Sequence, residues 1–253
     1  MSKYYNGKRT KNLFIPGASA GYKISRLKLD LFIKCPRCFY IDRRLGVGHP
    51  SGFPFTINSA IDHLLKKEFD EYRLARQPHP LMREAQIDAI PCEHEKLEQW
   101  RTNVTGVQVR HERTGLLIYG AIDDLWITPE QQHLVVEYKA TSKDQPVTIN
   151  ARWQAGYKRQ LEIYQWLLRG SDLAVSDTGY FVYCNGRRRS PRFDGHLDFD
   201  IALIPYVGSD AWVDGCIVDA YMCLMSDEIP RKTWNCDYCT YHNAVTDVIQ
   251  DRQ

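Results

Sequence analysis

The chain reads Gly120-Ala121-Ile122-Asp123-Asp124 and, a short interval later, Leu134-Val135-Val136-Glu137-Tyr138-Lys139. The apolar run that begins the second stretch predicts a β-strand, and in a strand residues two apart point to the same face. Glu137 and Lys139 should therefore project together, and Tyr138 should point to the opposite face. Charge beside a buried apolar run is costly unless it is paired or bound to a metal. Glu137 and Lys139 are thus candidates for a functional site.

Two carboxylates and a lysine that meet on one sheet face are the minimum equipment for metal-assisted hydrolysis of a phosphodiester. Carboxylate oxygens bind a hard divalent cation, the cation lowers the pKa of a bound water, and the lysine orients or deprotonates that water. Asp123 and Glu137 are the candidate carboxylates, and Lys139 is the candidate lysine. A purely structural interpretation stays open, because Asp-Asp pairs are common in turns and Glu-x-Lys occurs in many strands.

Length and composition predict a globular protein built around one sizeable core. The chain has 253 residues, of which 43% are hydrophobic and 25% charged, and its net charge is +2. We expect a flexible basic tail over residues 1–23 and a single domain over residues 24–253. No run approaches the roughly 18 apolar residues of a membrane helix, and the polar N-terminus does not resemble a secretory signal. We therefore expect a cytoplasmic protein with no membrane partner.

Four of the eight cysteines are arranged as two C-x-x-C motifs, Cys35 with Cys38 and Cys236 with Cys239. In a chain without an export signal, such pairs indicate metal ligands rather than disulfides. A site made from both pairs would join the N-terminal region 24–48 to the C-terminal region 226–253. Four thiolates suit a tetrahedral Zn²⁺ and a [4Fe–4S] cluster equally. Two unrelated pairs of reduced thiols are the structural alternative.

Hydrophobic periodicity predicts an α/β fold with a mixed central sheet flanked by helices. Helical spacing of apolar residues covers 25–35, 57–72, 150–169 and 210–225. Strand-like runs bounded by turn residues cover 104–110, 116–122, 133–139, 179–184 and 196–203. Residues 37–48 are expected to be a short connection. The order of helices, strands, a helix, strands and a final helix places helices on both faces of the sheet.

Three motifs in this order resemble the successive motifs of RecB-type nucleases in the PD-(D/E)XK superfamily: Gly120-x-x-Asp123, Glu137-x-Lys139 and Gln160-Leu-Glu-Ile-Tyr164. The opening segment, from Ser25 through Cys35-Pro to Tyr40, is similar to the first helix of the same group. The resemblance covers roughly residues 24–240, and its specificity comes from the ordered occurrence of the motifs. It implies a restriction-endonuclease-like core.

The resemblance also implies a site. Mg²⁺ or Mn²⁺ would be held by Asp123 and Glu137, with Lys139 as the catalytic lysine. Gln160 and Tyr164, one helical turn apart and so on one face, would reach the site or the bound strand. The alternative for this pair is an ordinary contact on a helix surface.

A histidine on an early helix often supplies a further metal ligand in this group, and His63 is the candidate here. The chain departs from the group's pattern, because Ser59 stands where a glycine often precedes that histidine by four residues. Asp62, the neighbour of His63, is a competing ligand. An exposed helix histidine is the structural alternative for His63.

The cysteines resemble those of the iron–sulfur subset of the group, which includes CRISPR-associated RecB-like exonucleases and AddB-type subunits. Those proteins typically use one N-terminal and three C-terminal cysteines, whereas this chain offers two and two. A structural zinc site is therefore at least as natural as an iron–sulfur cluster.

These features together favour a metal-dependent deoxyribonuclease that acts on DNA ends or single strands. The arginine-rich loop 187–192 is a candidate contact to the DNA backbone. A helicase or another repair or recombination protein is the expected partner. Two alternatives stay open: a catalytically inactive DNA-binding module of the same fold, and a hydrolase of RNA or of a small molecule.

Overall fold

The computed structural model describes residues 7–18, 21–50, 52 and 55–252, which fall into two compact units. The cysteine unit is drawn from Met1–Phe53, Arg110–Ile118 and Ala211–Gln253. The sheet unit is drawn from Pro54–Val109 and Tyr119–Asp210. Residues 54–109 belong to the sheet unit and residues 110–118 to the cysteine unit, so strands β3 (Val107–Arg110) and β4 (Leu117–Gly120) each contain residues of both units.

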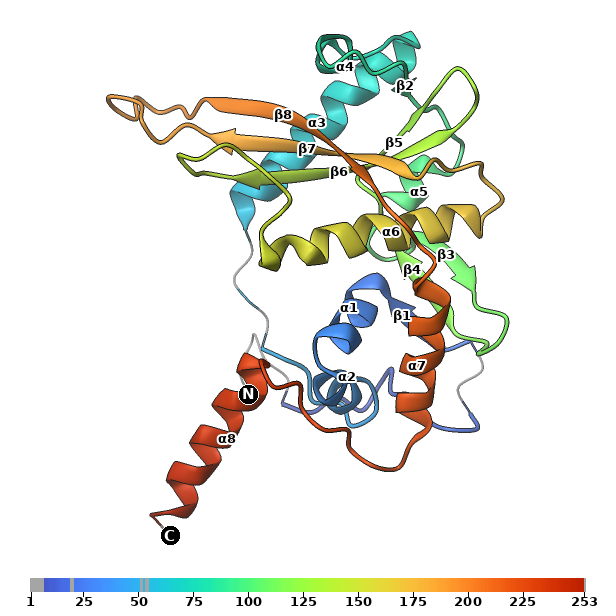
Figure 1. Cartoon of the computed structure of the whole chain (residues 1–253), viewed down its shortest axis with the longest axis vertical. Coiled ribbons are helices and arrows are strands. Elements are labelled where there is room, and N and C mark those ends of the chain that lie inside the picture. Colours follow the sequence, from blue (N-terminus) through green and yellow to red (C-terminus); the bar gives the residue numbers. More distant parts are fainter. Residues whose placement is uncertain (1–6, 19–20, 51, 53–54, 253) are drawn as a thin grey trace. The chain divides into compact units, whose positions relative to one another are not determined.

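The sheet unit is built on a mixed sheet with the strand order β2-β5-β6-β7-β8 (Figure 1). Its central strands β6 and β7 are parallel, with Glu137 opposite Phe181 and Lys139 opposite Tyr183. The pairs β2–β5, β5–β6 and β7–β8 are antiparallel. The strands are β2 (Ile90–Pro91), β5 (Asp124–Ile127), β6 (His133–Thr141), β7 (Thr178–Gly186) and β8 (Phe199–Val207).

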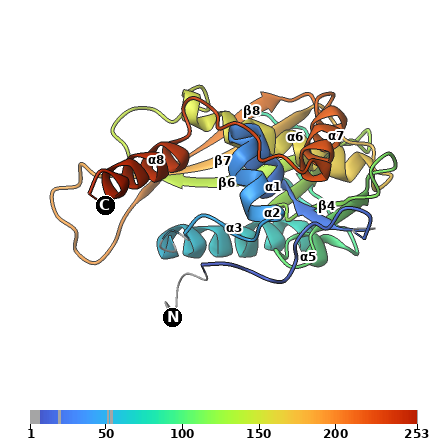
Figure 2. The same ribbon diagram turned by 90° about the horizontal axis from the view of Figure 1, so that it is seen from below.

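Helices cover both faces of this sheet, with α3 (Thr56–Ala75) and α6 (Ala155–Arg169) on opposite sides (Figures 1 and 2). Phe69 of α3 packs in a buried cluster with Val136 and Tyr138 of β6. Successive strand residues point to opposite faces, so Glu137 and Lys139 face α6. The predicted mixed α/β fold with helices on both faces is confirmed. The sheet unit also contains α4 (Pro80–Glu84), α5 (Leu97–Trp100) and the 3-10 turn η1 (Arg152–Gln154).

Close packing of α6 on the sheet requires a glycine in β7. A Cβ atom on Gly179 would lie 2.9 Å from the Leu161 side chain of α6 and 2.7 Å from the Val135 carbonyl of β6. Both distances are too short for a methyl group, and one of the two neighbours is backbone that cannot move aside easily. Gly179 therefore lets α6 approach the strand that carries Glu137 and Lys139.

The cysteine unit contains strand β1 and a group of helices. The Tyr40 hydroxyl donates to the Ser226 carbonyl at 3.1 Å, and Arg44 donates to the Leu224 carbonyl at 3.0 Å. These bonds connect the end of α2 with the end of α7. The elements are β1 (Lys23–Ser25), α1 (Arg26–Lys34), α2 (Pro36–Arg43), α7 (Val213–Met225) and α8 (Asp237–Gln250).

Part of the segment predicted as a tail, residues 7–18, packs within the cysteine unit. Phe14 is buried and meets the rings of Tyr22 and Tyr221 edge to face. The guanidinium of Arg9 forms an ion pair with Asp42 at 3.0 Å. Residues 1–6 and 19–20 lie outside the described residues. That residues 24–253 behave as one domain stays a prediction. Within the described part of the chain, no helix combines the length and the apolar character needed to cross a membrane.

Candidate active site

Asp123 lies directly before β5 and is hydrogen-bonded to the backbone of β6. Its Oδ2 atom accepts a hydrogen bond of 2.9 Å from the backbone N–H of Tyr138. The side chain keeps 22% of its surface exposed, so its other oxygen can reach a ligand. Because Tyr138 follows Glu137 directly, this bond brings the first predicted carboxylate beside the strand segment that carries the second.

Glu137 and Lys139 leave β6 on the same face and contact each other. The Lys139 ammonium donates to Glu137 Oε2 at 2.7 Å, and the Glu137 side chain is fully buried. A carboxylate at such depth is stable only with a cation or strong donors beside it. The geometric expectation from strand alternation therefore holds for this pair.

The face of α6 that meets β6 continues the contact with two further predicted residues. Gln160 Oε1 lies 3.5 Å from the Lys139 Nζ atom, at the long limit for a hydrogen bond. Gln160 Nε2 in turn donates to the Tyr164 hydroxyl at 3.3 Å. Glu137, Lys139, Gln160 and Tyr164 thus form one continuous chain of polar contacts across the strand and the helix.

Lys139 borders a cavity of about 110 Å³. The cavity is bounded by Asn58 and Asp62 from α3 and by Tyr157 from α6. The Lys139 ammonium lies 5.1 Å from the centre of the Tyr157 ring, within the range of a cation–π contact. This volume holds a few water molecules, so the lysine can meet a small ligand group there.

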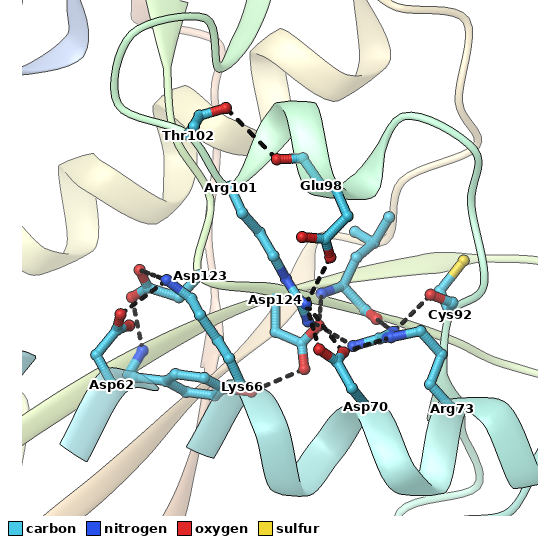
Figure 3. A network of polar contacts seen from close by, with 12 residues as sticks. Asp62, Lys66, Asp70, Arg73, Cys92, Glu98, Arg101, Thr102, Asp123 and Asp124 are labelled. Atoms are coloured by element: carbon cyan, nitrogen blue, oxygen red, sulfur yellow. Dashed lines mark hydrogen bonds and ion pairs between the residues drawn. The ribbon is translucent and has the colours of Figure 1, made fainter. Parts of the chain in front are cut away.

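His63 and Asp62 lie differently, although they are neighbours on α3. The His63 side chain is exposed and borders a second, wider cavity of about 660 Å³. Asp62 borders both cavities and is linked to Asp123 by Lys66, as Figure 3 shows. The lysine lies 2.9 Å from Asp62 Oδ2 and 3.8 Å from Asp123 Oδ1. The role of His63 as a metal ligand stays a prediction.

The second residue of the Asp-Asp pair, Asp124, belongs to a buried network on the α3 side of the sheet (Figure 3). Its Oδ1 atom accepts from Arg73 at 2.5 Å and from Arg101 at 2.8 Å. Its Oδ2 atom accepts from the Tyr138 hydroxyl at 2.8 Å. Burial raises the pKa of Tyr138 well above its usual value and the Asp124 charge raises it further, so the hydroxyl stays a donor.

Sequence reasoning missed Lys66, Arg73 and Arg101. For Lys66 a signal was present, because Asp62 and Lys66 stand four residues apart on one helix, a spacing at which opposite charges meet. Arg73 and Arg101 reach Asp124 from positions 51 and 23 residues away. No local pattern in the sequence predicts contacts between residues so far apart in the chain.

The donor atoms at Asp123 and Glu137 suit a hard divalent cation. Carboxylate oxygens are the preferred ligands of Mg²⁺ and Mn²⁺, and such ions usually bind one or two protein carboxylates and complete their coordination with water and substrate oxygens. Asp123 is partly exposed, and its hydrogen bond from the Tyr138 N–H places it next to the strand segment that carries the buried Glu137, so the two carboxylates are candidates for one ion. The two carboxylates therefore fit the Mg²⁺ or Mn²⁺ ion that the sequence implies.

The four cysteines of the two C-x-x-C motifs gather in the cysteine unit, as predicted. Their sulfur atoms lie within 4.8 Å of one another, and measured pairs are 3.5 Å for Cys38–Cys236 and for Cys38–Cys239 and 3.8 Å for Cys35–Cys239. Among the described residues this is the one group of three or more His, Cys, Asp or Glu side chains that meets so closely.

Local structure explains why these thiols converge. Cys35 and Cys236 directly precede α2 and α8, so each C-x-x-C motif spans the first turn of a helix. Burial raises the pKa of Cys35, but backbone hydrogen bonds from Thr233 and Cys38 outweigh it and lower the pKa to about 7. The Cys35 thiol is therefore readily deprotonated, as a metal ligand must be, whereas burial raises the pKa of Cys38 and of Cys239, so those two thiols would lose their protons when a metal binds.

Comparison with known proteins identifies the family of the chain. The profile of the PD-(D/E)XK nuclease superfamily matches residues 54–244, which include the whole candidate site. The chain belongs to the PD-(D/E)XK nuclease superfamily. The placement indicates a metal-dependent, nuclease-like function, and the superfamily generally uses Mg²⁺ or Mn²⁺.

Other comparisons of this PD-(D/E)XK protein give weaker matches. No curated protein matches the chain. A solved structure described as "Crystal structure of SSO0001" is 17% identical, with a TM-score of 0.40, and the match covers 90% of this chain and 86% of that one.

Proposed function

We propose that this PD-(D/E)XK protein is a RecB-like, Mg²⁺- or Mn²⁺-dependent deoxyribonuclease that cleaves DNA at ends or in single strands. The observation that carries the proposal is the contact between the buried Glu137 and Lys139, beside a cavity and next to the anchored Asp123. A buried ion pair is expensive to maintain for structure alone. Its position at the edge of a cavity supports a catalytic role.

Each side chain has a distinct task in the proposed reaction. The divalent ion held by Asp123 and Glu137 would lower the pKa of water and neutralise charge on the scissile phosphate. Lys139 donates to a phosphate oxygen or to the attacking water and stabilises the negative charge of the transition state. Gln160 orients the Lys139 ammonium through its Oε1 atom, and Tyr164 fixes the amide of Gln160.

An exposed tryptophan beside the site supports single-stranded DNA as the substrate. Trp153 in η1 keeps 66% of its surface exposed and meets the Tyr157 ring edge to face at 5.6 Å. Tyr157 borders the cavity of Lys139. Unpaired bases stack on exposed aromatic rings, whereas paired bases are hidden in the duplex. Trp153 would therefore hold a base of the strand whose phosphate enters the cavity.

The arginine-rich loop that joins β7 and β8 is a weaker candidate for DNA contact. Arg187 forms an ion pair with Asp200 at 2.6 Å, and Arg188 and Arg189 lie 3.1 and 3.2 Å from Asp144. These exposed pairs are worth little energy and can open when a phosphate arrives. The role of the loop as a backbone contact stays part of the proposal, as does a helicase or repair partner.

For the cysteine site we infer a structural zinc ion. Four thiolates about 2.3 Å from a tetrahedral zinc are about 3.8 Å apart, by the geometry of a tetrahedron. The measured sulfur separations of 3.5 and 3.8 Å agree with that value. A [4Fe–4S] cluster binds each thiolate through a different iron and therefore needs the sulfur atoms farther apart.

The nuclease proposal is tested with purified protein, linear and circular DNA, and Mg²⁺, Mn²⁺ or chelator. We expect metal-dependent cleavage of linear single-stranded DNA that is abolished by Glu137→Gln and retained by Glu130→Gln, a variant of an exposed residue in a turn. Binding of DNA without any cleavage, unchanged by Glu137→Gln, would instead establish the inactive binding module. Cleavage of RNA in preference to DNA would overturn the choice of substrate.

A further inference from the structure

Lys66 stands between two carboxylates at the mouth of the candidate site. Its ammonium lies 2.9 Å from Asp62 Oδ2 and 3.8 Å from Asp123 Oδ1 (Figure 3). The contact with Asp62 is made within α3, four residues apart, whereas the contact with Asp123 crosses from the helix to the start of β5. One flexible side chain of α3 thus balances the charge of a residue assigned to the divalent ion.

This position differs from that of the other lysine of the site. Lys139 is directed at Glu137 and Gln160 on the face of the sheet that meets α6. Lys66 borders the wider cavity on the other side of Asp62, together with His63 and Lys67, and 21% of its side chain is exposed. A lysine head group on a four-carbon stem can leave such a place without disturbing the backbone.

We propose that Lys66 makes the binding of the divalent ion depend on DNA. This inference rests on the proposed nuclease function. While no DNA is present, the ammonium neutralises the charge of Asp123 and repels the divalent ion, so the ion binds weakly. A phosphate of the incoming strand offers Lys66 another anion. When the lysine moves to that phosphate, both carboxylates become available, and the affinity for the ion rises.

The electrostatic basis is the short distance between the charges. The ammonium of Lys66 attracts a carboxylate about 4 Å away strongly when both groups are partly shielded from water. The same ammonium repels a divalent ion at that distance, and the repulsion is twice that of a monovalent ion. Because the coupling of two ligands is reciprocal, DNA should also bind more tightly in the presence of the ion. The ion would then be taken up mainly where a strand is ready for cleavage.

The experiment measures binding of Mn²⁺ by calorimetry in a Lys139→Met background, so that no DNA is consumed, and at a temperature at which circular dichroism shows every variant to be folded. The heat specific to the site is the part lost in a further Glu137→Gln variant. Without DNA, Lys66→Gln should bind Mn²⁺ on the order of tenfold more tightly than its parent. Lys66→Arg keeps the charge and should resemble the parent. Lys67→Gln, the same change at the exposed neighbour, should leave the affinity unchanged.

A second titration includes a short single-stranded oligonucleotide. The parent should then gain affinity for Mn²⁺, and the difference from Lys66→Gln should largely disappear. Equal or weaker Mn²⁺ binding by Lys66→Gln without DNA would overturn the inference and leave the nuclease proposal intact. Absence of any Mn²⁺ binding that depends on Glu137 would overturn both.

Discussion

The Lys139 ammonium contacts Glu137 Oε2 at 2.7 Å, and the two side chains leave strand β6 on the same face. The pair is therefore both a buried ion pair and the centre of the candidate site. These two roles can be separated by mutation. Stability depends on the balance of charge within the pair, whereas the proposed catalysis needs both the carboxylate of Glu137 and the ammonium of Lys139.

Lys139→Met should abolish cleavage and also weaken the fold. It removes the proposed donor to the phosphate, a loss that typically lowers the rate about 10²–10³-fold, and it leaves Glu137 buried without its ammonium. The double variant Glu137→Gln/Lys139→Met should recover much of the lost stability but no activity. Urea denaturation and single-turnover cleavage measure the two effects. A double variant no more stable than Lys139→Met would contradict the buried-charge explanation.

Gln160 is expected to act through Lys139, so its removal should slow chemistry more than binding. Gln160→Ala should lower kcat about tenfold or more with little change in KM, since a misplaced donor stabilises the transition state less well. Tyr164→Phe, which removes one hydroxyl from the same chain of contacts, should have a smaller effect in the same direction. Steady-state kinetics on single-stranded DNA decides this. An increase in KM alone would place Gln160 in substrate binding instead.

The buried network at Asp124 should contribute to the stability of the fold rather than to the cleavage reaction. Asp124→Asn removes the carboxylate that faces Arg73 and Arg101 and leaves two buried guanidinium groups with less compensation. The expected loss is about 3–5 kcal/mol of unfolding free energy. Asp88→Asn, at an exposed position, is the control and should stay within about 0.5 kcal/mol of wild type. Thermal and urea unfolding report both values.

The parts of the site that sequence could foresee are those set by local periodicity. Strand alternation placed Glu137 with Lys139, and helical spacing placed Gln160 with Tyr164, because both relationships depend only on backbone geometry. The C-x-x-C motifs likewise indicated ligands from their spacing. Strand β5 was missed, since four residues beginning with aspartate carry too short a pattern to stand out from a turn.

Other features depend on contacts that no local pattern encodes. Helix α2 was expected to be a connection, although Pro36 at its first position is a frequent helix start. Helix α8 was not expected beyond the cysteine pair at its beginning. The partners of Asp124 and the contact of Lys66 with Asp123 arise only when α3, α5 and β5 pack together. Charge pairs between distant segments are therefore the main part of the site that required the structure.

The cysteine site should bind one zinc ion per chain and contribute to folding. Cys38→Ser should reduce the zinc content and lower the unfolding temperature, because binding of a structural metal adds directly to folding free energy. Cys223→Ser, which changes a half-buried thiol of α7 outside the cluster, should keep the zinc. Metal analysis and thermal unfolding test the pair of variants. A brown protein that contains iron and sulfide after anaerobic purification would contradict the zinc assignment.

Trp153 should determine the preference for unpaired DNA. Trp153→Ala removes an exposed ring beside the cavity of Lys139, and loss of one stacked base typically costs about 1–3 kcal/mol of binding. Affinity for a single-stranded oligonucleotide should therefore fall severalfold or more, whereas Trp153→Tyr should retain most of it. Trp234→Ala alters a tryptophan of the cysteine unit that is 78% exposed, and it should change nothing. Equal losses for single-stranded and blunt duplex DNA in Trp153→Ala would show that the ring contributes to binding without reading strand form.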